Sequence, residues 1–278
     1  MMKPRRCAGS GPFTAGKYNV MAHEFNGRKY GKASAHQKEW GTRLIGELAL
    51  KGNERVLDLG CGDGILTARI ADLIPNGKVT GIDASIGMID TARLKKRRNL
   101  RFILMDIDNL DFIDEFDIIF SNAALHWIRD HGHLLGNVRR ALRDGGCVRF
   151  SFAGDGNCAA FFRVIREAMA LERFSSCFDE FEWPWFMPGV DEYRALIEKS
   201  GFHDTLVRGE NADRFFPDRQ AMTGWIDQPS IVPFLARVPE PEKQAFRDFV
   251  VRRMIEETER EDGRCFETFR RVKVSAKK

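Results

Sequence analysis

Residues 55–64 join a short apolar run to a turn that is rich in glycine. Residues 56–59 are mostly apolar and β-prone, as in a buried parallel strand, and residues 65–70 favour a helix. Between them lie Gly60, Gly62 and Gly64. Glycine lets the backbone turn tightly and lets a ligand approach it, and the first amides of a helix point toward such a ligand. The spacing predicts a nucleotide-type binding site.

The residues around this turn narrow the choice of ligand. A dinucleotide fingerprint, G-x-G-x-x-G, needs a third glycine where this sequence has Ile65. Asp58 and Asp63 would also repel a pyrophosphate. S-adenosylmethionine (SAM) carries a sulfonium and an ammonium beside its adenosine, so an acidic turn favours SAM over NAD.

A further acidic residue follows at the distance that such a site needs. Residues 78–83 are typical of a second buried strand, and Asp83 ends it about 20 residues after the glycines, where a carboxylate can bind ribose hydroxyls. Strand, glycine turn, helix, strand and terminal acid together indicate one nucleoside-binding unit.

These segments resemble the motifs of the class I SAM-dependent methyltransferases. Residues 58–64 look like the first motif of that family and Asp83 like its ribose-binding acid, and the resemblance continues through Asp106 and residues 122–127. It covers most of the chain from about Met21 onward. The resemblance implies a Rossmann-like α/β fold, SAM as the cofactor and methyl transfer as the reaction.

Two segments resemble a narrower group. Residues 81–89 and the run Asn-Ala-Ala-Leu-His-Trp at 122–127 are similar to trans-aconitate methyltransferases and to insect juvenile hormone acid methyltransferases. Both are small-molecule carboxyl methyltransferases, which implies transfer to a small-molecule oxygen, a carboxylate. His126 stands where the trans-aconitate pattern commonly has glutamine, so we expect an acceptor that is more apolar than a tricarboxylate.

The resemblance also implies a set of cofactor-binding residues. They are Gln37, Asp58, Gly60, Cys61, Gly62, Asp83, Ala84, Met88, Asp106, Ile107 and Asn122. Asp106 and the amide of Ile107 would read the adenine, Met88 would lie against it, and Gln37 would lie near the methionine end of SAM. A solvated helix face explains Gln37 equally well. Asp108 is expected to be a solvated loop acid.

The loop after the fourth predicted strand carries the catalytic candidates His126 and Trp127. Ligands of a doubly wound sheet bind at the carboxyl ends of its strands, which places this loop near the transferred methyl group. A carboxylate acceptor needs no general base, so His126 would orient it. Arg214 and Arg219 are further candidates for a carboxylate clamp, although both could equally be surface arginines. His131 and His133 lack a third ligand, so no metal site is predicted.

Composition limits the classes of protein that the chain can belong to. Its 278 residues are 43% hydrophobic, and no run reaches the ~20 apolar residues of a membrane helix. The six cysteines contain no C-x-x-C pair, which disfavours a zinc site and a disulfide framework. The cations of residues 1–20 account for the whole net charge of +4, so the body lacks the basic excess of a nucleic-acid enzyme. We expect a cytoplasmic enzyme without nucleic-acid or membrane partners; the oligomeric state stays open.

The order of predicted elements gives a complete fold. We expect residues 1–20 to be a disordered extension and residues 21–278 to form one α/β domain. Its core would be a seven-stranded, mostly parallel, Rossmann-like sheet with helices on both faces and a helical cap within about 155–260. Residues 205–216 and 266–275 would be its last two strands. The aromatic stretch 174–186 would pack the cap or wall an acceptor pocket.

Two other functions fit parts of this pattern. A methyltransferase acting on nucleic-acid bases would be indicated by a basic body, by Asn/Asp-Pro-Pro-aromatic after the fourth strand, or by a Pro-Cys nucleophile, and the sequence has none of these. Motifs alone leave open a methyltransferase acting on another small molecule, or a SAM-binding module without catalysis. Product formation that depends on the cofactor would separate the last case from an enzyme.

Overall fold

The computed structural model describes residues 35–278, without the side chains of residues 35–36 and 228–229. The predicted extension, residues 1–20, lies outside the described residues. Every structural statement below concerns the described part of the chain.

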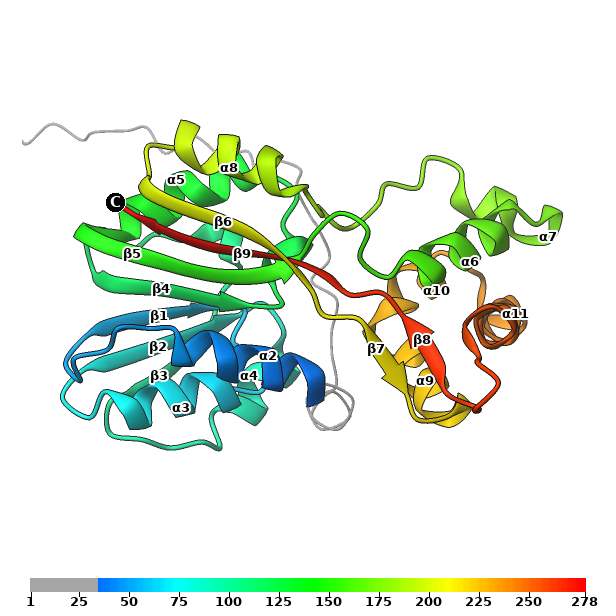
Figure 1. Cartoon of the computed structure of the whole chain (residues 1–278), viewed down its shortest axis with the longest axis horizontal. Coiled ribbons are helices and arrows are strands. Elements are labelled where there is room, and N and C mark those ends of the chain that lie inside the picture. Colours follow the sequence, from blue (N-terminus) through cyan, green and yellow to red (C-terminus); the bar gives the residue numbers. More distant parts are fainter. Residues whose placement is uncertain (1–34) are drawn as a thin grey trace, which may run out of the picture.

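Seven strands form one sheet in the order β3-β2-β1-β4-β5-β9-β6 (Figure 1). Their bounds are β1 (Arg55–Leu59), β2 (Lys78–Asp83), β3 (Leu100–Leu104), β4 (Phe116–Asn122), β5 (Leu142–Ala153), β6 (His203–Asn211) and β9 (Arg270–Lys277). β9 runs antiparallel to both of its neighbours, β5 and β6, and the other strand pairs of this sheet are parallel. The predicted fold class is confirmed.

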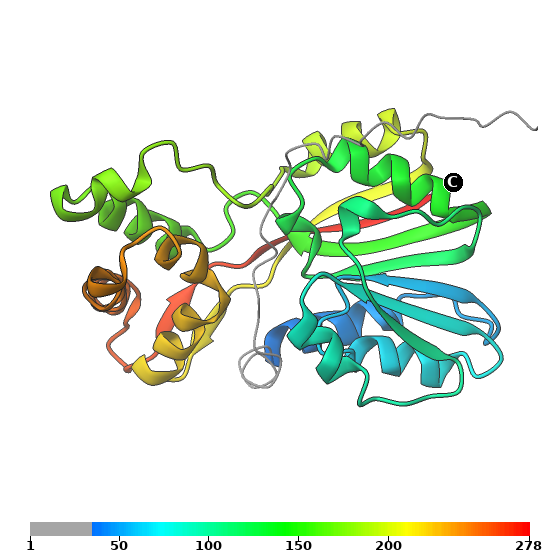
Figure 2. The ribbon, with the colours of Figure 1, turned by 180° about the vertical axis from the view of Figure 1, so that it is seen from behind.

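Helices cover both faces of the sheet (Figures 1 and 2). On one face lie α2 (Ala35–Gly46), α3 (Ile65–Leu73) and α4 (Ile86–Ala92), and on the other lie α5 (His131–Ala141) and α8 (Val190–Lys199). Strand β1 shows why both faces need cover: Val56 packs in the cluster under α2 and α3, whereas Leu57 and Leu59 pack in the cluster under α5 and α8. A strand that is apolar on both faces is buried in this way.

The last two predicted strands are each broken into two. The stretch predicted at 205–216 forms β6 and then β7 (Arg214–Phe216), and the stretch predicted at 266–275 forms β8 (Cys265–Glu267) and then β9. β7 and β8 pair with each other outside the main sheet. Asp213, at the first break, accepts a hydrogen bond from the amide of Phe269 at 3.0 Å and forms an ion pair with Arg270. Both strands therefore leave the sheet at the same place and continue into the cap.

The cap is a second, mainly helical lobe at the end of the sheet (Figure 1). It contains α6 (Ala159–Ala170), α7 (Glu172–Ser175), η3 (Ser176–Phe178), α9 (Arg219–Trp225), η4 (Ile226–Ser230), α10 (Val232–Leu235), α11 (Glu240–Thr258) and the β7–β8 pair. The predicted range 155–260 is not continuous, because α8 and β6 return to the sheet. The aromatic stretch predicted at 174–186 packs largely around Phe234 of α10.

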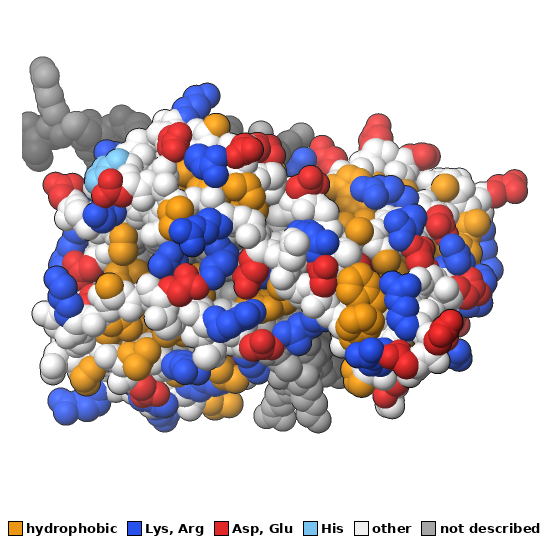
Figure 3. All heavy atoms as spheres, in the orientation of Figure 1, with side chains coloured by type: hydrophobic (Ala, Val, Ile, Leu, Met, Phe, Trp, Pro, Cys, Tyr) orange, Lys and Arg blue, Asp and Glu red, His pale blue; other side chains and the backbone are white. Residues whose placement is uncertain are grey.

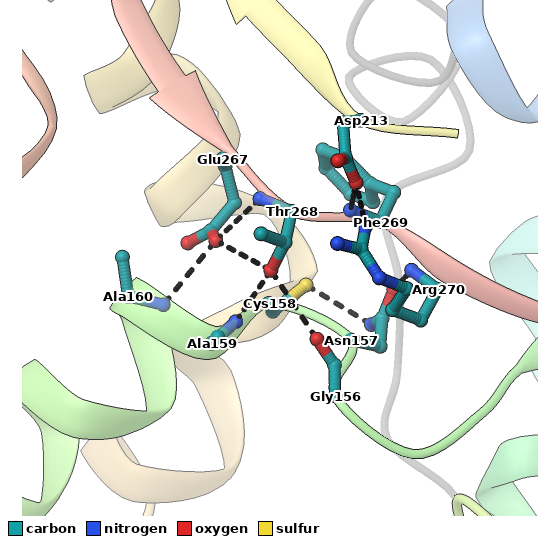
Figure 4. A network of polar contacts seen from close by, with 10 residues as sticks. All are labelled: Gly156, Asn157, Cys158, Ala159, Ala160, Asp213, Glu267, Thr268, Phe269 and Arg270. Carbon is teal, nitrogen blue, oxygen red and sulfur yellow. Dashed lines mark hydrogen bonds and ion pairs between the residues drawn. The ribbon is translucent and has the colours of Figure 1, made fainter. Parts of the chain in front are cut away.

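A polar network joins the sheet to the cap where the chain crosses between them (Figure 4). Glu267 is 1% exposed and accepts hydrogen bonds from the amides of Phe161 at 2.9 Å and Ala160 at 3.3 Å, in the first turn of α6. Thr268 donates its own amide to the same carboxylate at 2.7 Å. Burial raises the pKa of Glu267 against the lowering effect of these donors. One buried carboxylate thus satisfies donors from two crossing segments.

Charges of both signs are interspersed over the face of the molecule drawn in Figure 3. Among the described helices, none combines the length and apolar character that a bilayer crossing requires.

Replacing Glu267 should destabilise the cap. Glu267→Ala leaves the buried amides of Ala160 and Phe161 without acceptors, and we expect it to lower the free energy of unfolding by roughly 2 to 4 kcal/mol. Glu267→Gln keeps one acceptor oxygen and should fall between the wild type and Glu267→Ala. Urea denaturation at neutral pH measures the three values. Equal stability of the wild type and Glu267→Ala would contradict this role.

Candidate functional site

A cavity lies between the carboxyl ends of the sheet strands and the cap, and we call it the central cavity. The structure brings to its wall the predicted catalytic residues and all the predicted cofactor-binding residues except Asp58 and Cys61. Those present are Gln37, Gly60, Gly62, Asp83, Ala84, Met88, Asp106, Ile107, Asn122, His126 and Trp127. Cap residues such as Phe161, Phe162 and Trp225 line its other side. Residues far apart in the sequence therefore share one site.

The glycine turn after β1 adopts a conformation that needs glycine. Gly60, Gly62 and Gly64 have φ values of 68°, 54° and 75°, in the left-handed region. A Cβ on Gly60 would lie 2.3 Å from the Cβ of Ala124, in the loop that follows β4. The missing side chain lets these two loops approach closely, and the cradle they form fits a nucleoside against the backbone.

Asp83 holds this turn in place. Its Oδ2 accepts a hydrogen bond from the amide of Gly62 at 2.9 Å, and its Oδ1 accepts one from the amide of Ser85 at 2.9 Å. Ser85 caps α4, its hydroxyl accepting from the amide of Met88 at 3.3 Å. Asp83 thus connects the glycine turn to the start of α4 and also lines the central cavity.

The two predicted residues outside the cavity wall lie beneath the turn. Asp58 is 2% exposed and accepts a hydrogen bond from the Thr67 hydroxyl at 2.6 Å. Burial raises the pKa of Asp58 to about 7, against the lowering effect of the Thr67 hydrogen bond. Burial likewise raises the pKa of the Cys61 thiol. Both positions differ from the predicted direct contact with a cofactor and indicate support of the turn.

The turn is less acidic than the sequence predicts. Asp63 pairs with Lys38 of α2, Nζ to Oδ2 3.2 Å, and Asp58 is partly protonated at neutral pH because of its burial. The carboxylates that face the cavity are Asp83, Asp106 and Asp108. The carboxylates that would repel a pyrophosphate in the cavity are therefore Asp83, Asp106 and Asp108, and not Asp58 and Asp63 as the sequence predicted.

Asp108 differs from its prediction as a solvated loop acid. It lines the central cavity, and its Oδ1 is buried with no hydrogen-bond partner among residues 35–278. Burial and the neighbouring charge of Asp106 raise its pKa. Asp106 accepts a hydrogen bond from the Asp108 amide at 3.0 Å and so begins η1 (Ile107–Asn109). Either carboxylate could accept from an adenine amino group.

His126 and Trp127 line another part of the cavity wall, in η2 (Leu125–Trp127). Burial lowers the pKa of His126 to about 3, with further lowering by the positive charge of Arg271 and by His131. Its Nδ1 has no hydrogen-bond partner in the described part of the chain. The centroids of the Trp127 and Trp185 rings are 5.3 Å apart. This part of the wall combines aromatic rings with a neutral histidine.

Arg271 of β9 is the principal site residue that the sequence did not predict. It is 4% exposed and lines the central cavity. Its Nη2 donates to the Asn122 Oδ1 at 3.1 Å, and its Cζ lies 4.2 Å from the centroid of the Trp40 ring. β9 is antiparallel and comes from the far end of the chain, so no local motif marks this arginine.

The arginines that the sequence proposed as carboxylate clamps bind elsewhere. Arg219 pairs with Glu259 through both carboxylate oxygens, at 2.6 and 2.7 Å, and is largely exposed. Arg214 donates to Glu39 at 2.5 Å. Neither lines the central cavity. Asp218 caps α9 at this point, so the two arginines flank a surface turn.

The histidine pair is structural. His131 is buried between the Tyr193 hydroxyl, at 3.1 Å from Nδ1, and the Leu125 carbonyl, at 2.9 Å from Nε2. Burial lowers its pKa to about 4. His133 contacts the Asp108 carbonyl at 3.2 Å through its Nε2. No cluster of metal-binding side chains occurs among the described residues.

Comparison with known proteins decides the family. Residues 56–146 match the family described as "Methyltransferase domain". The chain is 30% identical to the trans-aconitate 2-methyltransferase of Deinococcus radiodurans over 70% of this chain and 76% of that protein. It is 31% identical to an uncharacterized methyltransferase of Schizosaccharomyces pombe over 84% of this chain and 90% of that protein. The chain belongs to the class I SAM-dependent methyltransferases.

A solved structure agrees with the fold of this methyltransferase. The phosphoethanolamine N-methyltransferase 2 of Haemonchus contortus, in complex with SAM, superimposes with a TM-score of 0.57 at 19% identity. The match covers 91% of this chain and 56% of that one. SAM is the cofactor of this methyltransferase, as the sequence predicted. The glycine cradle and the acidic wall of the central cavity are the features of this structure that fit it.

The central cavity of the methyltransferase has two chemically different ends. Asp83, Asp106 and Asp108 suit a nucleoside whose amino acid end is cationic. Arg271 is the single Lys or Arg among the described residues that line the cavity. We call the wall around these three carboxylates the cofactor end and the wall around Arg271, His126 and Trp127 the acceptor end. Asn122, a predicted cofactor residue, accepts a hydrogen bond from Arg271 and so joins the two.

Removing the carboxylate of Asp83 should weaken SAM binding. Asp83→Ala deletes a charge-assisted acceptor for ribose hydroxyls and also frees the amides of Gly62 and Ser85, so we expect at least a tenfold loss, since each such hydrogen bond contributes roughly 1.5 to 3 kcal/mol. Calorimetric titration with SAM measures it. Asp63→Asn, which changes an acid of the same turn outside the cavity wall, serves as the control. An unchanged dissociation constant for SAM in folded Asp83→Ala would contradict the assignment of Asp83 to the ribose hydroxyls.

Proposed function

We propose that this methyltransferase transfers the methyl group of SAM to a carboxylate oxygen of a small organic acid. The observation that carries the proposal is the buried guanidinium of Arg271 at the acceptor end of the central cavity. A buried arginine binds carboxylates through charge-assisted hydrogen bonds, often two at once. The names of the trans-aconitate relatives support the same acceptor class.

The protonation state of His126 supports a carboxylate over an acceptor that must lose a proton. With a pKa of about 3, His126 is neutral and a very weak base at neutral pH. An alcohol, a phenol or an ammonium group would need a base to become nucleophilic, whereas a carboxylate is already ionised. His126 can instead contact the acceptor as a neutral hydrogen-bonding group, through the Nδ1 that lacks a described partner.

Positioning is then the main task of the acceptor end. SAM supplies the methyl group as an activated electrophile, bound at the acidic end. Arg271 would hold the acceptor carboxylate, and His126 would orient it toward the cofactor end. Trp127 and the cap residues around it exclude water, which strengthens these interactions. No residue has to remove a proton.

The aromatic part of the cavity wall indicates the character of the rest of the acceptor. Trp127, Trp185 and Phe162 form a continuous aromatic surface, with Phe162 and Trp185 centroids 5.4 Å apart. A second or third carboxylate would lie against these rings without a partner cation, at a cost in desolvation. We therefore expect an acid with one carboxylate and an apolar body to be a better acceptor than a tricarboxylate.

A panel of acids tests the proposed reaction. We expect the protein to convert carboxylic acids and methyl-labelled SAM into base-labile methyl esters. At saturating SAM, kcat/KM for a monocarboxylate should stay constant from about pH 6 to 9, because the acid and His126 both titrate below that range and Asp58, with a pKa of about 7, does not line the cavity. Label in base-stable products, such as N-methyl amines, or a rate that rises tenfold per pH unit, would refute the carboxylate acceptor and leave the methyltransferase assignment intact.

Two variants separate acceptor binding from cofactor binding. Arg271→Leu should raise the KM for the acid by roughly tenfold or more, because it removes a charged hydrogen bond to the carboxylate. The affinity for SAM should change much less. His126→Ala should lower kcat more than SAM affinity. Arg219→Leu, which removes an exposed arginine outside the cavity, is the matched control and should behave as the wild type. If Arg219→Leu impairs the reaction as much as Arg271→Leu does, the clamp is assigned to the wrong arginine.

A further inference from the structure

The side chain that orients Arg271 is Ser151, in β5. Ser151 is 2% exposed, and its hydroxyl accepts hydrogen bonds from the Nε of Arg271 at 3.0 Å and from its Nη2 at 2.8 Å. The carbonyl of Ser151 accepts a further bond from the same Nη2 at 2.9 Å. The Nε–Nη2 edge of the guanidinium is therefore fixed to one residue of the neighbouring strand.

The same carbonyl also anchors the loop that carries His126 and Trp127. The amide of Ala123 donates to it at 2.7 Å. Ala123 has a φ of 57°, a left-handed conformation that is uncommon for a residue other than glycine and that clusters at functional sites. Ser151 thus sets the position of Arg271 relative to the start of this loop.

Ser151 does not line the central cavity, so it can influence an acceptor only through the residues it holds. The guanidinium is planar with its N–H donors in a fixed fork, so fixing Nε and Nη2 fixes the plane in which its donors point. The Trp40 ring, 4.2 Å from the Cζ, lies over the guanidinium, and Asn122 accepts from Nη2. Ser151 supplies the contacts that set the in-plane orientation.

We propose that the Ser151 hydroxyl is a positioning group for methyl transfer: it holds the Arg271 guanidinium in the orientation that binds the acceptor. This inference rests on the proposed carboxylate function. It predicts a larger effect on acceptor binding than on SAM binding, because the hydrogen bonds of the Ser151 hydroxyl among the described residues go to Arg271.

Ser151→Ala and a matched control, Ser121→Ala, test the inference. Ser121 is also a buried serine, on the adjacent strand β4, and its hydroxyl donates to the Leu59 carbonyl at 2.8 Å without contacting Arg271. We expect Ser151→Ala to raise the KM for the acid about tenfold while the dissociation constant for SAM changes less than about twofold, the size expected for loss of one charged hydrogen bond. Ser121→Ala should leave the KM for the acid unchanged. Ser151→Thr, which keeps the hydroxyl, should restore most of the affinity for the acid.

A second measurement needs no acceptor. In protein with ¹⁵N-labelled arginine, the Nε–H resonance of Arg271 is identified by its loss in Arg271→Lys. Its exchange with water should be slow in the wild type and in Ser121→Ala, and faster by tenfold or more in Ser151→Ala, because the hydroxyl is the Nε–H acceptor.

The outcomes separate this inference from the proposed function. If the wild type methylates an acid and Ser151→Ala has the same KM, or loses SAM affinity as much as acid affinity, Ser151 does not position Arg271 and the carboxylate function stands. If the wild type methylates no carboxylic acid, the proposed function fails, and the exchange measurement alone decides whether Ser151 holds the guanidinium. Unchanged exchange in Ser151→Ala overturns the inference in either case.

Discussion

The hydrogen bonds that Asp83 accepts from Gly62 and Ser85 are the constraint on which the site depends. They join the turn after β1 to the start of α4 and keep a carboxylate at the cavity wall. The turn can come this close to the next loop because Gly60 has no side chain to meet Ala124. The cofactor end of the cavity is therefore built from backbone conformation and one carboxylate, with little dependence on the cap.

This dependence explains which features could be predicted from the sequence. Glycines with positive φ and an acid at the end of the next strand are local signals, and the first two strands and the helix between them were predicted close to their observed bounds. Parallel strands that carry polar residues at their carboxyl ends must bring those residues to one edge, so nearly all the predicted cofactor residues reach the cavity.

The sequence predicted much less where contacts are long-range. Arg271 enters the site because β9 inserts antiparallel between β5 and β6, which no local pattern announces. The breaks after Asn211 and Glu267 depend on Asp213 meeting Phe269 and Arg270, residues that lie far apart in the chain. Periodicity alone continues a strand through such a break.

Burial changed the meaning of the charged and polar residues that were predicted. The sequence predicts that Asp58 is a carboxylate near the ligand and that His126 orients the acceptor. In the structure, burial raises the pKa of the first to about 7 and lowers that of the second to about 3, so each is more neutral than its type suggests. The lowered pKa of His126 affects the choice of acceptor. A histidine that cannot take a proton near neutral pH cannot act as a base, so the site favours an acceptor that is already ionised, such as a carboxylate.

The two ends of the cavity also differ in what holds them together. The cofactor end belongs to the sheet, whereas the acceptor end is shared: Arg271 and His126 come from the sheet side, and Phe162 and Trp225 from the cap. The acceptor end exists only while the cap keeps its place, and Glu267, which binds the first turn of α6 to the segment leading into β9, lies four residues before Arg271. Contacts that position the cap therefore also position the segment that carries Arg271. Changes at this crossing should accordingly affect acceptor recognition more than they affect cofactor binding.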